Sequence, residues 1–99
     1  ALNNLAELLR ATNRLAEAEP LYRRALAIDE ASYGPDHPNV ANDLNNLAGL
    51  LFATNRLAEA EPFYRRALAI LTASLGTEHP NTQNGTKNLA ALLAKMEKP

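Results

Sequence analysis

The sequence predicts an all-α protein, an α-solenoid of antiparallel helix-turn-helix repeats with five helices. The main observation is an internal repeat: residues 1–42 return almost unchanged as residues 43–84, with 31 of 42 positions identical at this offset. A period of this length is typical of arrays in which supersecondary units stack on their neighbours. Residues 85–99 begin a third, partial copy, which we expect to act as a C-terminal capping helix. We therefore expect residues 1–99 to form a single repeat domain.

The spacing of apolar residues, together with the prolines and glycines between them, predicts where each helix begins and ends. Apolar residues of the second copy stand at i, i+3, i+4 and i+7, on one face of a helix: Leu44, Leu47, Ala48 and Leu51. Pro38 and Pro80 suit the first helical position, where a missing N–H costs nothing. Thr54-Asn55-Arg56 is expected to be a short polar break, and Gly34 and Gly76 are expected to be left-handed C-caps. The expected helices are, in chain order, 1–12, 15–32, 38–54, 57–74 and 80–97.

Pro20 and Pro62 stand inside the second helix of each copy, where proline normally breaks a helix. At about 100° per residue, Pro20 lies opposite Tyr22 and therefore faces solvent. We expect a mild bend at these prolines rather than a break. Two i,i+4 pairs are expected to support the exposed face: Glu19 with Arg23 and Glu61 with Arg65. The adjacent arginines at 23–24 and 65–66 are interpreted as a solvated convex face rather than a nucleic-acid site.

Composition excludes several classes of function. The net charge of −1 provides no basic field for nucleic acid or anionic lipid, so neither partner is expected. The absence of cysteine excludes disulfides and thiolate metal sites. Apolar residues are interrupted too often for a membrane span, and no signal peptide is visible, so we expect a cytoplasmic protein. Because the first residue falls in the middle of a copy, the chain is expected to be a fragment of a longer array.

No catalytic, metal or cofactor site is predicted. His37 and His79 are the two histidines, and they occupy the same place in successive copies. A residue that recurs with the period serves the repeat, so we expect each histidine to cap the following helix or to pack the turn. Asp29 falls on the inward face of its helix, where it either pairs with Asn42 or water, or reaches the surface near the helix end.

The two copies share residues that resemble the tetratricopeptide repeat. The matching positions are Leu5, Ala6, Leu9, Ala18, Tyr22 and Ala25, which return as Leu47, Ala48, Leu51, Ala60, Tyr64 and Ala67. The period of 42 with Leu-Asn-Asn-Leu-Ala and Ala-Glu-Pro-x-Tyr-Arg-Arg-Ala-Leu looks like the kinesin-light-chain type. The resemblance implies a right-handed superhelix with the first helix of each copy on the concave side. It also implies a protein-binding role.

On this resemblance, the polar sector of each first helix lines a groove for an extended peptide or a partner protein. The expected binding residues are Asn4, Arg10, Asn42, Asn45, Asn46, Phe52, Asn84, Lys87 and Asn88. Asn4, Asn46 and Asn88 form a ladder with one rung per copy, whose amides can both donate and accept hydrogen bonds from a peptide backbone. Alternatively, these asparagines satisfy loops and helix ends within the stack.

Phe52 is the most distinctive residue of this sector, because Arg10 and Ala94 stand at the same position of the other copies. Either it anchors a ligand side chain, or it tucks against helix 80–97 or a neighbouring molecule. Arg10 and Lys87, together with Lys95, make the sector weakly positive and so favour acidic peptides.

Two further functions remain open. The chain could be a structural spacer that oligomerises a larger protein and has no ligand of its own. It could also self-associate through helix 1–12, which has no preceding helix to cover it.

Overall fold

The computed structural model describes Leu8 and residues 14–97, and within them it contains four α-helices and no strand. They are α2 (Leu15–Tyr33), α3 (Pro38–Ala53), α4 (Leu57–Leu75) and α5 (Pro80–Glu97). Each begins at the residue expected from the sequence, and the ends differ by one residue at most. The helix expected at 1–12 falls outside the described residues except for Leu8, which is helical.

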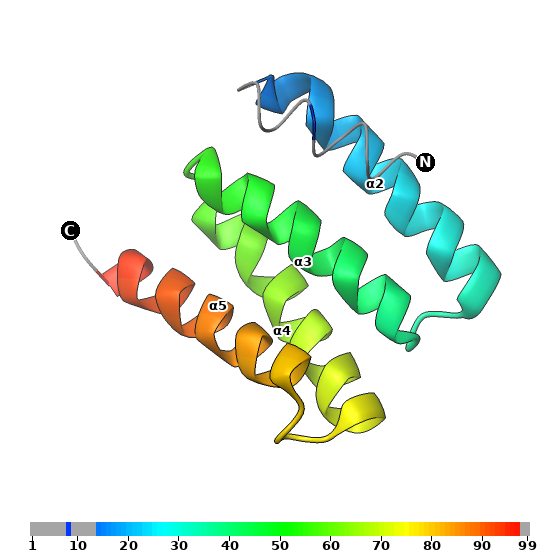
Figure 1. Cartoon of the computed structure of the whole chain (residues 1–99). Coiled ribbons are helices and arrows are strands. Elements are labelled where there is room, and N and C mark those ends of the chain that lie inside the picture. Colours follow the sequence, from blue (N-terminus) through cyan, green and yellow to red (C-terminus); the bar gives the residue numbers. More distant parts are fainter. Residues whose placement is uncertain (1–7, 9–13, 98–99) are drawn as a thin grey trace.

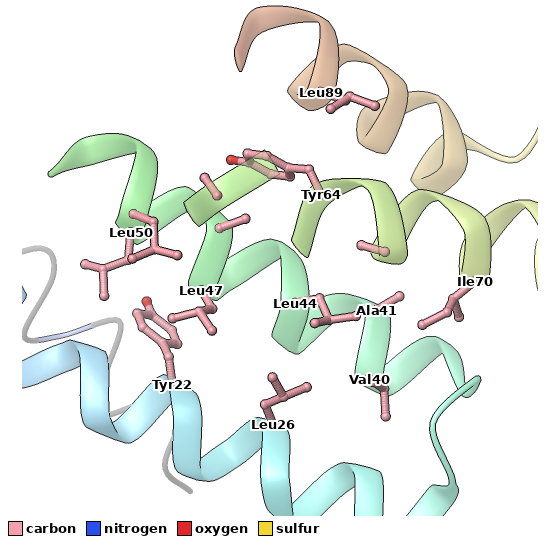
Figure 2. Packing of buried hydrophobic residues seen from close by; sticks show 14 of the residues in the cluster. Tyr22, Leu26, Val40, Ala41, Leu44, Leu47, Leu50, Tyr64, Ile70 and Leu89 are labelled. Carbon is pink, nitrogen blue, oxygen red and sulfur yellow. The ribbon is translucent and has the colours of Figure 1, made fainter. Parts of the chain in front are cut away.

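The helices pack in chain order, α2 on α3, α3 on α4 and α4 on α5 (Figure 1). Because α3 is packed between two helices, eight of its residues are buried. Figure 2 shows Tyr22 and Leu26 pointing from α2 toward α3, and Ile70 pointing from α4 toward Ala41. The core is therefore a continuous strip of leucine, alanine and tyrosine between successive helices, as the repeated apolar face predicts.

The outer face of α5 differs from the equivalent face of α3. Leu44 and Ala48 of α3 are fully buried, whereas Thr86 and Ala90 at the same positions of α5 are exposed. The Thr86 hydroxyl donates to the Thr82 carbonyl of its own helix at 3.2 Å. A polar residue thus stands where no described helix covers α5, and the capping role of this helix stays a prediction.

Both interior prolines lie in unbroken helices. α2 continues through Pro20 and α4 through Pro62, and both rings are exposed. Each proline forfeits one backbone hydrogen bond but leaves the buried face of its helix undisturbed. The predicted pairs on the same helices also form, with Arg23 Nε donating to Glu19 at 3.1 Å and Arg65 Nε donating to Glu61 at 2.8 Å.

A glycine ends the second helix of each copy and begins the turn to the next copy. Gly34 and Gly76 have φ of 88° and 86°, as expected for C-caps, but their ψ values of 164° and 163° are extended rather than left-handed helical. The expected left-handed helical ψ is wrong because the chain must leave the helix in an extended direction to reach the next one. The region is one that only glycine adopts readily.

The turn between α3 and α4 is a Schellman motif rather than an unspecified polar break. Asn55 has a φ of 63°, its N–H donates to the Phe52 carbonyl at 3.1 Å, and the Arg56 N–H donates to the Leu51 carbonyl at 2.8 Å. The Thr54 hydroxyl donates to the same carbonyl, Leu51, at 3.1 Å. Asparagine tolerates the left-handed conformation better than most residues, which explains its place in this turn.

Candidate functional site

A hollow of about 260 Å³ lies between α3 and α5. Its lining residues are Gly49, Phe52 and Ala53 of α3, Tyr64 of α4, and Asn88 and Ala91 of α5. Two of these six, Phe52 and Asn88, are among the binding residues expected from the sequence. The structure therefore places one expected residue from each of two successive copies at one depression.

Small side chains create the space. Gly49, Ala53 and Ala91 have a small side chain or none, and none of the three is buried. Tyr64 is only 6% exposed and packs in the core. Its position at the base of the hollow gives the depression an aromatic lining together with Phe52. Such a concave site with apolar walls and a few polar groups is suited to hold one side chain of a ligand.

Phe52 packs against other residues of this chain, and its role as an anchor for a ligand side chain stays a prediction. It is half-buried and packs against the core, and it also lines the hollow. The Lys95 ammonium of α5 stands over its ring, with Nζ 4.9 Å from the ring centroid. This cation–π contact ties α3 to α5 and places a positive charge at the edge of the hollow.

The predicted asparagines occupy different environments. Asn88 is exposed and lines the hollow, whereas Asn46 is half-buried and is not among the lining residues. Asn45 is half-buried, and its side-chain oxygen is buried with no hydrogen-bond partner among the described residues. The remaining predicted residues of α3 and α5 are exposed: Asn42, Asn84 and Lys87. Asn4 and Arg10 lie outside the described residues.

The two histidines have the capping role expected from their repetition. His37 is the N-cap of α3, and its Nδ1 accepts from the Asn39 N–H at 3.0 Å. His79 Nδ1 accepts from the Asn81 N–H at 3.1 Å in the same way. Tyr33 stacks on His37 with the ring centroids 4.5 Å apart. Within the described part of the chain, no group of three or more potential metal ligands is found.

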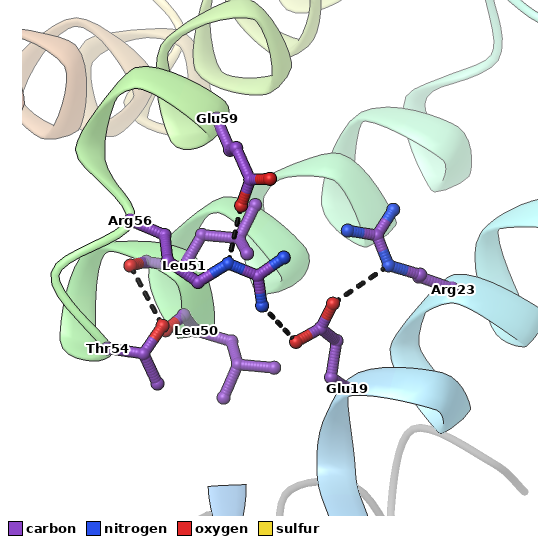
Figure 3. Close-up of polar contacts among 7 residues, drawn as sticks. All are labelled: Glu19, Arg23, Leu50, Leu51, Thr54, Arg56 and Glu59. Carbon is purple, nitrogen blue, oxygen red and sulfur yellow. Dashed lines mark hydrogen bonds and ion pairs between the residues drawn. The ribbon is translucent and has the colours of Figure 1, made fainter. Parts of the chain in front are cut away.

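Ion pairs between the copies were not predicted from the sequence. Arg56, at the start of α4, donates to Glu19 of α2 and to Glu59 of its own helix (Figure 3). Burial of Glu19 acts to raise its pKa, but hydrogen bonds from Arg56 and Arg23 and the charges of both arginines outweigh this and hold the pKa below its ordinary value. A carboxylate at this point therefore joins the first copy to the second.

A second tie lies farther along the same helices. Arg66 of α4 donates to Glu30 of α2 at 3.3 Å and to the Pro35 carbonyl at 3.3 Å. The Arg66 side chain stays 38% exposed, but it also contacts the preceding copy, which the interpretation of the arginine pairs as a solvated convex face did not include. Asp29 is half-buried, and no hydrogen bond joins it to Asn42.

A larger hollow, of about 830 Å³, was also missed by the sequence reasoning. Its lining residues are Asn55, Arg56, Leu57, Ala58 and Glu59 at the start of α4, and Lys95 and Met96 at the end of α5. The sequence differs between the copies at this hollow, because Lys95-Met96 in the third copy replaces Ala53-Thr54 of the second copy. This replacement lengthens the helix beyond the point where α3 ends.

Antiparallel helices stacked in chain order, with a hollow between successive first helices, define an α-helical repeat protein. A model of the tetratricopeptide repeat matches residues 1–73 and again residues 44–99. The chain therefore belongs to the tetratricopeptide repeat family. Repeats of this family generally mediate protein–protein interaction and are typically non-enzymatic scaffolds.

The fold is also similar to that of a solved protein, BtubC (BKLC) from P. vanneervenii. The two structures agree with a TM-score of 0.87 at 26% sequence identity, over 95% of this chain and 37% of that one. This chain thus spans well under half the length of that protein. The likeness supports the kinesin-light-chain type inferred from the repeat sequence. None of the curated proteins matches the chain. No helix in the described residues is long and apolar enough to cross a membrane.

Proposed function

We propose that this chain is a protein-interaction module that binds an extended peptide segment of a partner along the face formed by α3 and α5. The observation that carries this proposal is the hollow between the two helices, where an aromatic ring, an exposed amide and a lysine converge. We take α3 and α5 as the concave side of a right-handed superhelix within the single domain 1–99, as the family resemblance implies.

Each component of the hollow has a specific role in this proposal. The Asn88 amide has both donors and an acceptor, so it can hydrogen-bond the backbone of a peptide whatever its sequence. Phe52 and Tyr64 provide apolar surface for one ligand side chain. Lys95 and the exposed Lys87 favour a carboxylate beside that side chain. The ligand class is therefore an extended, acidic peptide with an apolar side chain.

A peptide array of graded net charge tests the proposal. Acidic peptides selected from the array are labelled and titrated by fluorescence anisotropy. Phe52→Ala removes an aromatic contact and is expected to weaken binding about thirtyfold or more. Asn88→Ala removes hydrogen bonds and is expected to weaken binding about fivefold. Asn46→Ala tests the second rung of the ladder.

Asn39→Ala and Asn81→Ala are matched controls, because these asparagines are exposed on the same two helices but do not line the hollow. Circular dichroism confirms that every variant is folded. If Phe52→Ala and Asn88→Ala bind the selected peptides as tightly as the controls do, the α3–α5 face is not the binding face.

A structural spacer is the second candidate, and the ion pairs between copies favour it. Arg56 with Glu19, and Arg66 with Glu30, join successive copies on the face of α2 and α4. Such ties suit a stiff segment that holds other parts of a protein at a fixed distance. Under this candidate, we expect the chain to bind no peptide of the array. We also expect its assembly to be unchanged when Asn46 and Asn88 are replaced by alanine. Self-association through residues 1–12 and a cytoplasmic location stay predictions from the sequence.

A further inference from the structure

The lysine that stands over the Phe52 ring does not recur with the period of the sequence. Lys95 Nζ lies 4.9 Å from the centroid of this ring. The equivalent residues one copy earlier are Arg10 in place of Phe52 and Ala53 in place of Lys95. That earlier pair contains no aromatic ring, so it cannot make the same contact. The cation–π contact is therefore specific to the hollow between α3 and α5.

The ammonium of Lys95 covers the part of the Phe52 ring that a ligand would use. Phe52 is half-buried and packs against the core. Because the Lys95 side chain is exposed, its ammonium lies on the side of the ring that solvent reaches. A ligand side chain that packs on this side must displace the ammonium and break the cation–π contact. Lys95 also lines the larger hollow, which gives its side chain space to turn away from the ring.

The same ammonium is available to a carboxylate of a ligand. Lys95 forms no ion pair within the described part of the chain. Glu59 lines the larger hollow with it, but this carboxylate is bound by Arg56. An acidic ligand can therefore pair with Lys95 without first separating another ion pair. Such a ligand recovers the free energy that displacement of the ammonium costs, whereas a neutral ligand does not.

The two contributions of Lys95 are of similar size. An exposed cation–π contact favours the ammonium over the ring by about two- to fivefold. An exposed ion pair favours a complex by up to about fivefold. For an acidic ligand the two factors nearly cancel, whereas a neutral ligand bears the cost alone. Specificity is a difference of affinities, and a penalty on the wrong ligand is one way to obtain it.

We infer that Lys95 is a specificity-determining residue, which covers Phe52 and thereby penalises neutral ligands of the hollow. This inference rests on the proposed function and specifies how the hollow selects acidic peptides. Lys95 adds little to the affinity for an acidic peptide, and its main effect is to lower the affinity for a neutral one. Simple attraction predicts the reverse, because the loss of Lys95 would then weaken acidic peptides and leave neutral ones unchanged.

A matched pair of peptides tests the inference. One is an acidic peptide selected from the array, and the other is the same peptide with its acidic residues changed to their amides. Both are titrated by fluorescence anisotropy. Lys95→Ala should tighten binding of the neutral peptide about two- to fivefold and change binding of the acidic peptide less than about twofold. Lys95→Arg keeps a cation that stacks on aromatic rings, so it should preserve the preference of the unaltered chain.

Two further measurements serve as controls. Arg65→Ala also removes one positive charge, but from an exposed side chain that lines neither hollow, and it should leave both affinities unchanged. A double-mutant cycle of Phe52→Ala and Lys95→Ala, measured by urea unfolding without a peptide, reports the contact itself. The cycle should show a coupling of about two- to fivefold in the unfolding equilibrium constant.

The outcomes separate this inference from the function on which it rests. If neither peptide binds, the proposed function is overturned and the inference falls with it. If the acidic peptide binds, the inference alone is overturned by any of three results. These are a cycle without coupling, equal effects of Lys95→Ala on the two peptides, and failure of Lys95→Ala to bind the neutral peptide more tightly than the unaltered chain does.

Discussion

Replacing glycine by alanine is expected to have opposite effects at two positions of this chain. Gly85 lies buried inside α5, where a Cβ would stand 3.5 Å from Leu68 Cδ1 and 3.7 Å from Leu71 Cδ1, both ordinary contact distances. Glycine in a helix interior costs about 0.5–1 kcal/mol relative to alanine, and a buried methyl group contributes about 0.8 kcal/mol. Gly85→Ala should therefore stabilise the protein by about 1–2 kcal/mol.

Gly76 has more free space around it than Gly85, since no atom lies within 4 Å of a Cβ added there. Its backbone decides the outcome instead, because φ is 86° and ψ is 163°. Holding a residue other than glycine in this region costs about 1–3 kcal/mol. Gly76→Ala should destabilise the protein by that amount, and Gly34→Ala should do the same at the equivalent turn.

Thermal and urea unfolding followed by circular dichroism measures both effects. For a chain of this size, about 1 kcal/mol corresponds to a shift of about 4–8 °C in Tm. Gly85→Ala should raise Tm and Gly76→Ala should lower it. A fall in Tm for Gly85→Ala would show that Leu68 and Leu71 leave no room for a methyl group, and an unchanged Tm for Gly76→Ala would refute the backbone argument.

Three further predictions concern the turns and the ties between copies. Asn55→Ala should lower the free energy of unfolding by about 1 kcal/mol, because an L residue is disfavoured at positive φ. Asn55→Gly should leave the free energy of unfolding unchanged. Urea unfolding measures both variants. Folding lowers the pKa of Glu19, so the stabilisation from this carboxylate is fully present above its pKa in the unfolded chain and is lost as pH falls through its pKa in the folded protein. Glu19→Gln should flatten the free energy of unfolding as a function of pH in this range. An unchanged curve would count against the ion pair with Arg56. His37→Ala and His79→Ala should each lower stability by about 0.5–2 kcal/mol, and asparagine at either position, which keeps an acceptor, should recover most of the loss in the same assay.

The helices were predictable because nearby residues determine where each one begins and which face is buried, and because the two copies carry the same signals. Pro38 and Pro80 fix where α3 and α5 begin, and the apolar positions of the two copies agree on which face is buried. The capping role of His37 and His79 was predictable for a related reason, since each histidine recurs at the same place of its copy, between an acidic residue and a proline. In each case the information lies within a few residues of the feature that it determines.

The contacts between copies were not predictable, because they depend on the spacing of helices in space. Arg66 meets Glu30 only because α2 and α4 both pack on α3 in a way that brings the two side chains within reach. The sequence places both residues on exposed faces of their own helices, where a solvated surface is the simplest expectation. The two cap glycines show the same limit, since positive φ was expected from the glycine but ψ is set by the direction in which the next helix lies.

Residues that line the groove differ between the copies, whereas the leucines that pack the helices recur. Phe52 is replaced by Ala94 at the next equivalent position, and that alanine is exposed without disturbing the burial of Leu92. A side chain at this position can therefore change between copies while the neighbouring leucine keeps the helix packed. Under the proposed function, a ligand would be discriminated at such positions, and its backbone would be held by amides that stay constant, such as Asn46 and Asn88. Variation at exposed positions of the groove, such as Ala91 and Ala94, then carries little cost in stability, because these side chains do not pack the array.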